Sequence, residues 1–156
     1  MKRALPLLLI VFFLNSHRAD SQARGYYPKG GPDMGEEVSL IQLIANPDAY
    51  DGKRVRVLGY LHLEFEGDEI YLHREDFDYS IMKDAIWINM PTDITTVQRK
   101  AINDRYVICT AIFRSHRHGH MGMSSGEFDE VTRIEPWPRR PTGPFTPPPP
   151  QRKKVK

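Results

Sequence analysis

The chain has a single cysteine, Cys109, among its 156 residues, so no disulfide can form within it. Apolar residues, Ile108, Ala111 and Ile112, lie close to it in the sequence. The sequence beside it shows no basic residue and no helix start, the features that would lower the pKa of the thiol. We therefore expect Cys109 to be a small buried side chain, with a reactive thiol as the less favoured alternative.

The chain also lacks an apolar run of the ~20 residues that a membrane-spanning helix needs. Its longest apolar run, Ala4–Leu14, follows Lys2 and Arg3 and ends at polar residues. Ser21-Gln22-Ala23 then places small residues at the two key positions of a cleavage site. We interpret residues 1–23 as a signal peptide rather than an anchor. This predicts a periplasmic or secreted mature protein without a membrane span.

Catalytic signatures are missing as well. No nucleophile–base pairing, phosphate-binding loop or metalloprotease helix motif occurs. Paired carboxylates can act as acid and base, and seven of them crowd one region. They are Glu64, Glu66, Asp68, Glu69, Glu75, Asp76 and Asp78. They fall on a predicted turn and loop, where solvated charge is the simpler interpretation, so we predict that the chain is not an enzyme.

Basic charge is scarce in the body of the chain. Residues 36–135 contain 11 Lys/Arg against 18 Asp/Glu, whereas residues 136–156 contain six Lys/Arg and no acid. Phosphate contacts supply most of the non-specific affinity for nucleic acid, so a nucleic-acid-binding body should itself be basic. We therefore expect no nucleic-acid partner.

Both flanks of the body are rich in proline or glycine. Residues 24–35 have no hydrophobic period and predict a flexible leader. Residues 138–156 combine seven prolines with the six basic side chains, which favours an extended, disordered tail. Alternatively, the tail is an electrostatic arm that contacts anionic lipid, cell-wall polymer or the acidic body of another copy.

Residues 36–137 predict five strands and two helices. The first helix follows Ser39, a capping residue, and ends before Pro47. The second follows Thr92 or Asp93, with Ile94, Val97, Ala101 and Ile102 facing inward. The strands cover 53–65, with a bend at Gly59, and then 69–74, 85–90, 105–114 and 127–137, with a bulge in the last. Residues 75–84 predict a loop with a helical turn.

This order predicts a mainly β fold, a small five-stranded OB-fold-like Greek-key barrel with one N-terminal helix and one helix between strands 3 and 4. Three segments carry a family resemblance: SLIQLIANPDAYDGKRVRVLGYL, AIWINM and GHMGMSSGEFDEVTRIEPW. On these segments, residues 36–137 resemble exported OB-fold-like proteins of bacteria. The resemblance implies the fold and export, and it implies no particular activity.

Aromatic and histidine side chains gather on the middle strands. They are Tyr60, His62, Tyr71, His73 and Trp87. If they point outward, they form a stacking platform for sugars or bases, or a contact surface for a protein. The alternative is that one strand face is covered, with Trp87 packed under the second helix.

Histidines also alternate in the segment before the last strand. His116, His118 and His120, with Met121 and Met123 behind them, would share one face of an extended stretch. Imidazole binds copper and zinc, and thioether binds Cu(I), so a Cu or Zn site is a candidate. The alternative is a hairpin tip in which Gly119, Gly122 and Gly126 supply unusual backbone angles.

These observations predict an exported, non-enzymatic binding or interaction module of the bacterial cell envelope. Its partner would be an envelope protein or glycan. The first alternative is a periplasmic transition-metal-binding protein that uses residues 116–123. The second, weaker alternative is oligonucleotide or oligosaccharide binding on the barrel face.

Overall fold

The computed structural model of the chain describes residues 25–27 and 34–138. The predicted signal peptide, part of the predicted leader and nearly all of the predicted tail lie outside the described residues. Within these ranges, no helix is both long and apolar enough to cross a membrane.

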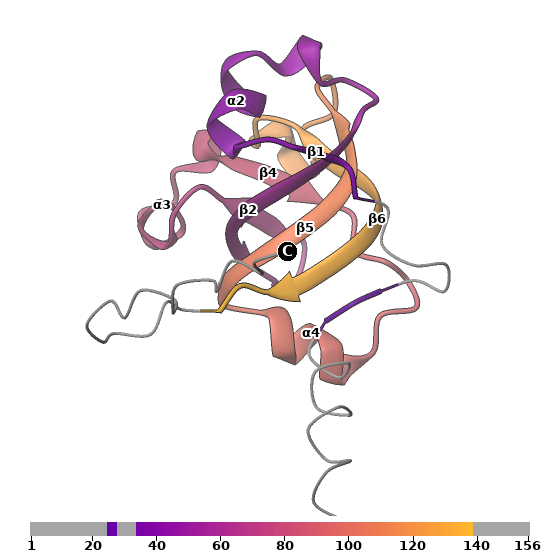
Figure 1. The fold of residues 1–156 in the computed structure, drawn as a ribbon. Coiled ribbons are helices and arrows are strands. Elements are labelled where there is room, and N and C mark those ends of the chain that lie inside the picture. Colours follow the sequence, from indigo (N-terminus) through magenta and orange to yellow (C-terminus); the bar gives the residue numbers. More distant parts are fainter. Residues whose placement is uncertain (1–24, 28–33, 139–156) are drawn as a thin grey trace, which may run out of the picture.

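Five strands form a closed barrel, which confirms the predicted fold class. In chain order they are β2 (Arg54–His62), β3 (Glu69–Tyr71), β4 (Ala85–Ile88), β5 (Arg105–Arg114) and β6 (Glu127–Pro136). They pair in the order β2–β3–β4–β6–β5, and β5 also pairs with β2, closing the barrel. Figure 1 shows β2, β5 and β6 side by side. A short strand, β1 (Glu36–Glu37), adds in parallel to the outer edge of β2.

Alternate residues of the long strands fill the barrel interior. On β2, Val55 and Val57 are buried, whereas Leu58 is 43% exposed. On β5 and β6, Phe113 and Phe128 are fully buried, and their ring centroids lie 5.9 Å apart in an edge-to-face arrangement. Because side chains alternate across a strand, the intervening residues form the outer surface of the barrel.

Cys109 faces this interior from β5. It is buried, and the burial raises the pKa of its thiol to about 12. Because the thiolate is the reactive form, the side chain is inert at neutral pH. The predicted small buried side chain is confirmed.

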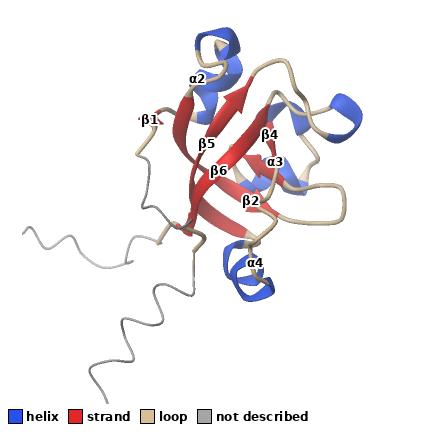
Figure 2. Cartoon of the chain, turned by 90° about the vertical axis from the view of Figure 1, so that its right-hand side faces the viewer, coloured by secondary structure: helices blue, strands red, loops and turns tan. Residues whose placement is uncertain are grey.

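Two short helices lie at opposite ends of the barrel (Figure 2). Helix α2 (Leu40–Ala45) begins after Ser39, which forms a capping box with Gln42, and it buries Leu40 and Leu43. Helix α4 (Thr96–Ile102), between β4 and β5, buries Ile102. Both predicted helix positions are confirmed. A third helix, α3 (Arg74–Asp78), occupies the segment where the sequence predicts a loop with a helical turn.

The first strand of the barrel is shorter than predicted. We expected it to continue to Phe65, but β2 ends at His62. The backbone N–H of Leu63 donates to the Asn103 side chain at 2.6 Å instead of joining a strand ladder. Phe65 is 91% exposed in the following turn.

Helix α4 also begins later than predicted. Its cap is Thr95, not Thr92 or Asp93, because the Thr95 hydroxyl accepts from the Gln98 backbone N–H at 3.2 Å. The later start changes which side chains face inward. Val97, expected on the inner face, is 67% exposed.

A Thr95→Ala substitution is expected to lower the free energy of unfolding by ~1 kcal/mol, because it removes this cap. Thr96→Ala is the matched control, since Thr96 lies one residue further along and is exposed. Urea unfolding followed by circular dichroism measures both. Equal losses in the two variants would show that the cap does not stabilise α4.

The predicted bulge in the last strand is confirmed. On β5, Thr110 pairs with Arg133, but two residues later Ile112 pairs with Asp129, so β6 contains extra residues. Glu130, within them, has a positive φ of 45°. This irregularity explains why the apolar residues of β6 do not alternate cleanly.

Part of the predicted flexible leader is packed against the barrel. Tyr26 is 6% exposed, and its backbone exchanges hydrogen bonds of 2.6 and 3.0 Å with Ile134 of β6. Its hydroxyl donates to Asp93 at 2.8 Å. The expectation of an unpacked leader is therefore wrong at Tyr26, whose large ring covers part of the core.

Candidate functional site

Three connecting segments surround one side of the barrel. They are the turn 63–68 between β2 and β3, the segment 72–84 between β3 and β4, and the loop 115–126 between β5 and β6. Ligands of OB-folds commonly bind the second and third strands together with the first and last of these connections. We call the surface that these three segments form the loop face, and it is the candidate site.

Direct contacts join these segments. The Ser125 backbone N–H donates to the Ala85 carbonyl at 2.9 Å, and its hydroxyl donates to the Lys83 carbonyl at 2.6 Å. Across the face, His120 Nε2 lies 3.7 Å from a carboxylate oxygen of Glu66. The loop 115–126 therefore rests on the other two segments as one surface.

A buried carboxylate fixes the loop 115–126 against β3. Glu69 is 2% exposed and accepts hydrogen bonds from the hydroxyl of Ser124, at 2.5 Å, and from that of Tyr71. Burial, and then Glu69, raise the pKa of the Tyr71 phenol well above its ordinary value. Because a buried carboxylate is costly without such donors, the loop position is tied to the barrel core.

Glycine allows the same loop to lie directly on Trp87. At Gly119, φ is +64°, and an added Cβ would lie 2.3 Å from Cγ of Trp87. The indole N–H donates to the Asn89 side chain at 3.1 Å, and the ring of His120 lies 6.5 Å away. Trp87 is thus half-buried under the loop rather than under helix α4.

We expect Gly119→Ala to destabilise the chain more than Gly122→Ala. Both glycines have positive φ, where another residue costs ~1–3 kcal/mol, and Gly119 (φ 64°, ψ −160°) lies in a region that is essentially restricted to glycine. Nothing lies within 4 Å of a Cβ on Gly122. The clash with Trp87 should add ~1–3 kcal/mol at Gly119 alone. Urea unfolding and tryptophan fluorescence measure the difference. Equal losses would mean that the loop does not lie on Trp87.

The loop face carries an apolar groove of about 580 Å³, which we call the methionine groove. Its lining residues are Ser80, Ile81, Met82, Lys83, Gly122 and Met123. Ile81 and Met123 are 44% and 45% exposed, and neighbouring Met121 is 76% exposed. These side chains give the loop face exposed apolar surface, and methionine adapts its shape to a partner.

Acidic residues outnumber basic ones in the segments that form the loop face. Residues 63–84 and 115–126 together contain eight Asp/Glu against three Lys/Arg. Four of the acids, Glu64, Glu66, Glu75 and Asp78, are exposed. The three basic residues are exposed as well, and one of them, Lys83, lines the groove. The loop face therefore favours a partner that carries positive charge.

The five predicted ligand-binding residues do not share one open surface. Tyr60 and Tyr71 are buried because Phe77 of α3 covers them, with ring centroids 6.1 and 5.6 Å from theirs. The Phe77 ring also stacks on His62 at 4.0 Å. His73 is exposed at the start of α3. Tyr60 and Tyr71 are therefore not open to a stacking ligand, because α3 covers the surface on which such a ligand would lie.

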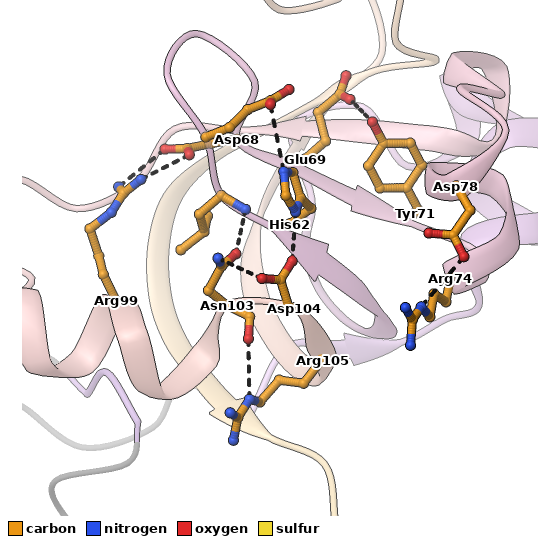
Figure 3. Close-up of polar contacts among 12 residues, drawn as sticks. His62, Asp68, Glu69, Tyr71, Arg74, Asp78, Arg99, Asn103, Asp104 and Arg105 are labelled. Atoms are coloured by element: carbon orange, nitrogen blue, oxygen red, sulfur yellow. Dashed lines mark hydrogen bonds and ion pairs between the residues drawn. The ribbon is translucent and has the colours of Figure 1, made fainter.

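Polar contacts hold His62 in place (Figure 3). Its Nδ1 lies 2.7 Å from a carboxylate oxygen of Asp104, and its Nε2 lies 3.6 Å from Glu64. Nearby, Arg99 of α4 donates to both carboxylate oxygens of Asp68, at 2.9 and 3.2 Å. These contacts tie the turn 63–68 to helix α4 and its end, so they position the edge of the loop face.

The three predicted metal-binding histidines contact three different partners. His116 Nε2 lies 3.8 Å from Asp48, and His118 Nδ1 lies 3.1 Å from the Ser124 carbonyl. His120 faces the turn 63–68, as described above. In residues 25–27 and 34–138, no group of three His, Cys, Asp or Glu side chains could hold a metal ion. The structure thus does not bring His116, His118 and His120 together.

Sequence reasoning missed the apolar part of the segment 72–84. Phe77, Tyr79, Ile81 and Met82 interrupt an acidic stretch that we interpreted as a polar loop. In the structure, Phe77 covers the aromatic cluster, and Ile81 and Met82 line the groove. Large apolar residues inside a polar segment were the available signal.

No protein-family model matches the chain, and no curated protein matches it. Among solved structures, the chain is similar to one assigned as an aspartyl-tRNA synthetase of Leishmania major Friedlin, at 12% sequence identity and a TM-score of 0.42. The similarity covers 76% of this chain and 24% of that one, so the chain spans about a quarter of its length. Neither sequence comparison assigns the chain to a family.

Proposed function

We propose that this chain is an exported, non-enzymatic binding module of the bacterial cell envelope, and that its loop face binds a basic, apolar segment of a partner protein. Fold alone does not imply function. The observation that carries the proposal is the methionine groove, an exposed apolar surface on the side of the barrel that OB-folds commonly use, in segments that hold more acidic than basic residues.

The chemistry of the groove supports this class of ligand over the others. Apolar side chains of a partner would lie against Ile81 and Met123, while lysine or arginine would face the exposed carboxylates of the loop face. The excess of acidic residues in these segments opposes an oligonucleotide, because phosphate contacts need cations. A neutral glycan would lack both the positive charge and the apolar side chains that this surface complements.

Export is supported by the sequence of residues 1–23, which lie outside the described residues. Fractionation of cells that express the full chain tests it. The mature form is expected in the periplasm or medium and to begin after Ala23. A full-length product retained in the cytoplasm would contradict export.

Selection of phage-displayed peptides on the purified mature chain tests the ligand class. Enriched peptides should combine Lys or Arg with apolar residues. Their affinity, measured by calorimetry, should fall about thirtyfold in a Met121→Ser, Met123→Ser double variant, because each buried methionine contact contributes on the order of 1 kcal/mol.

Met34→Ser is the matched control, because Met34 is exposed near β1, outside the groove. Its affinity for the enriched peptides should equal that of the parent chain. Enrichment of acidic peptides, or an affinity that the double variant leaves unchanged, would contradict the proposed ligand. Tighter binding of an oligothymidine or a cell-wall glycan at this face would replace it.

A further inference from the structure

A second groove, of about 500 Å³, lies on the outer surface of the barrel and shares no residue with the methionine groove. It lies between β1, the start of α2 and the outward residues of β2 and β5. Leu58, Ile108 and Trp137 supply apolar surface, and Leu58 and Trp137 are 43% and 51% exposed. Arg56 and Glu37 supply the charges. A volume of this size suits a small molecule.

Arg56 belongs to a row of three outward side chains on adjacent strands. Arg56 of β2 pairs with Thr110 of β5, which in turn pairs with Arg133 of β6. Thr110 is fully buried, and its hydroxyl has no hydrogen-bond partner among the described residues. The Nε atoms of Arg56 and Arg133 are also buried, and neither has a hydrogen-bond partner within residues 25–27 and 34–138. Three donors with unused capacity therefore occupy one row.

The guanidinium groups of Arg56 and Arg133, the two charged members of this row, repel each other. Burial, and then the neighbouring Arg56, lower the pKa of the Arg133 guanidinium. Arg133 contacts Glu135 on its own strand, and its guanidinium carbon lies 6.0 Å from the ring centre of Tyr27. Burial raises the pKa of Glu135. The same burial therefore disfavours the negative charge of Glu135, which would compensate the positive charge of Arg133. An additional anion near this row would be stabilised by both cations.

The carboxylate that now contacts Arg56 can be displaced. Glu37 Oε2 lies 2.5 Å from Arg56 Nη2, but the Glu37 side chain is 77% exposed and that of Arg56 only 20%. Surface ion pairs contribute little to stability, since water solvates the exposed partner well. A ligand oxyanion could therefore replace Glu37 on Arg56 while Glu37 turns into solvent.

We infer that this groove binds a small organic oxyanion that carries a flat apolar group. The oxyanion replaces Glu37 on the Arg56 guanidinium, whose planar fork suits carboxylate and phosphate, and Arg133 strengthens the positive potential behind it. The apolar group lies against Leu58, Ile108 and Trp137. Carboxylates and phosphate esters share this chemistry, and the test separates them.

Isothermal titration of the purified mature chain with indole-3-acetate tests the inference. Indole-3-acetamide is the matched neutral probe, and it should bind at least about tenfold more weakly because it lacks the charge-assisted contact. Acetate, which lacks the ring, should bind weakly too. Phenyl phosphate decides the source: tighter binding than indole-3-acetate indicates a phosphate ester, and weaker binding indicates a carboxylate. Equal binding of the acid and the amide, or no binding of either at millimolar concentration, would overturn the inference.

Variants locate the site. Glu37→Gln should tighten indole-3-acetate binding several-fold, because it removes the competing carboxylate, whereas Glu36→Gln, with the same charge change one residue away, should not. Arg56→Gln should weaken binding about tenfold, and Arg56→Lys should retain part of it, which separates loss of contact from misfolding. Equal effects of the two glutamate variants would contradict the site. The Met121→Ser, Met123→Ser variant should bind indole-3-acetate normally, so this site and the proposed loop-face function can fail separately.

Discussion

A Gly59→Val variant is expected not to fold stably. An added Cβ at Gly59 would lie 2.4 Å from Cγ2 of Ile70, 2.8 Å from Cδ1 of Leu40 and 2.8 Å from the Tyr71 carbonyl oxygen. One of these atoms is backbone and the other two belong to buried side chains, so none can move aside cheaply. Overpacking typically costs ~1–3 kcal/mol, and valine adds two further methyl groups to the same crowded place. The loss should therefore consume much of the ~5–15 kcal/mol that stabilises a domain.

Circular dichroism during thermal unfolding measures this effect. Gly59→Ala should unfold cooperatively at a lower temperature than the parent chain, and Gly59→Val should show no cooperative transition. Leu58→Val is the control, because Leu58 lies next in the strand and points outward. A Gly59→Val protein that unfolds at the parent temperature would show that β2 does not pack this closely on β3 and α2.

A Phe113→Ala substitution is expected to lower the free energy of unfolding by ~3–5 kcal/mol, the usual cost of a cavity left by a buried aromatic ring. Phe113 is fully buried and packs edge-to-face on Phe128, its partner on the adjacent strand β6. Phe65→Ala is the matched control, since Phe65 is 91% exposed and its loss should change stability by less than ~0.5 kcal/mol. Urea unfolding compares them. Similar losses at both positions would contradict the assigned core.

The barrel could be predicted because its long strands carry strong local patterns. The alternation around Val55 and Val57 fixes which face of β2 is buried, and Ser39 and Pro47 limit the first helix. The start of α4 was mispredicted because Thr92, Asp93 and Thr95 are all competent caps. The choice among them depends on Gln98, whose side chain completes the capping box at Thr95, a pairing that we did not weigh.

The candidate site was harder to predict because it depends on contacts between distant segments. The sequence left two alternatives for the second face of β2 and β3, an open platform or a covered face, and in the structure Phe77 of α3 covers Tyr60 and Tyr71. The alternate-histidine pattern predicts a shared face only in an extended chain. In the loop 115–126, Gly119, Met121 and Gly122 all have positive φ, so the period of two does not apply there.

The two grooves differ in the chemistry they favour. The methionine groove is apolar and lies on a face with more acidic than basic residues, whereas the groove at Arg56 joins apolar side chains to one guanidinium group, with Arg133 two strands away. A binding module with both would recognise a basic polypeptide on one surface and a small organic anion on another. Because the grooves share no residues, binding at each can be measured in variants of the other.

We propose above that the loop face binds a basic, apolar polypeptide segment. Nuclear magnetic resonance of methyl-labelled methionine tests it most directly, with a phage-selected peptide as the ligand. Met82, Met121 and Met123 lie in or beside the methionine groove, whereas Met34 lies near β1 and Met90 packs against the core. The peptide should shift the methyl signals of Met82, Met121 and Met123 and leave those of Met34 and Met90 in place. Shifts confined to Met34 or Met90, or binding that leaves all five signals unchanged, would contradict it.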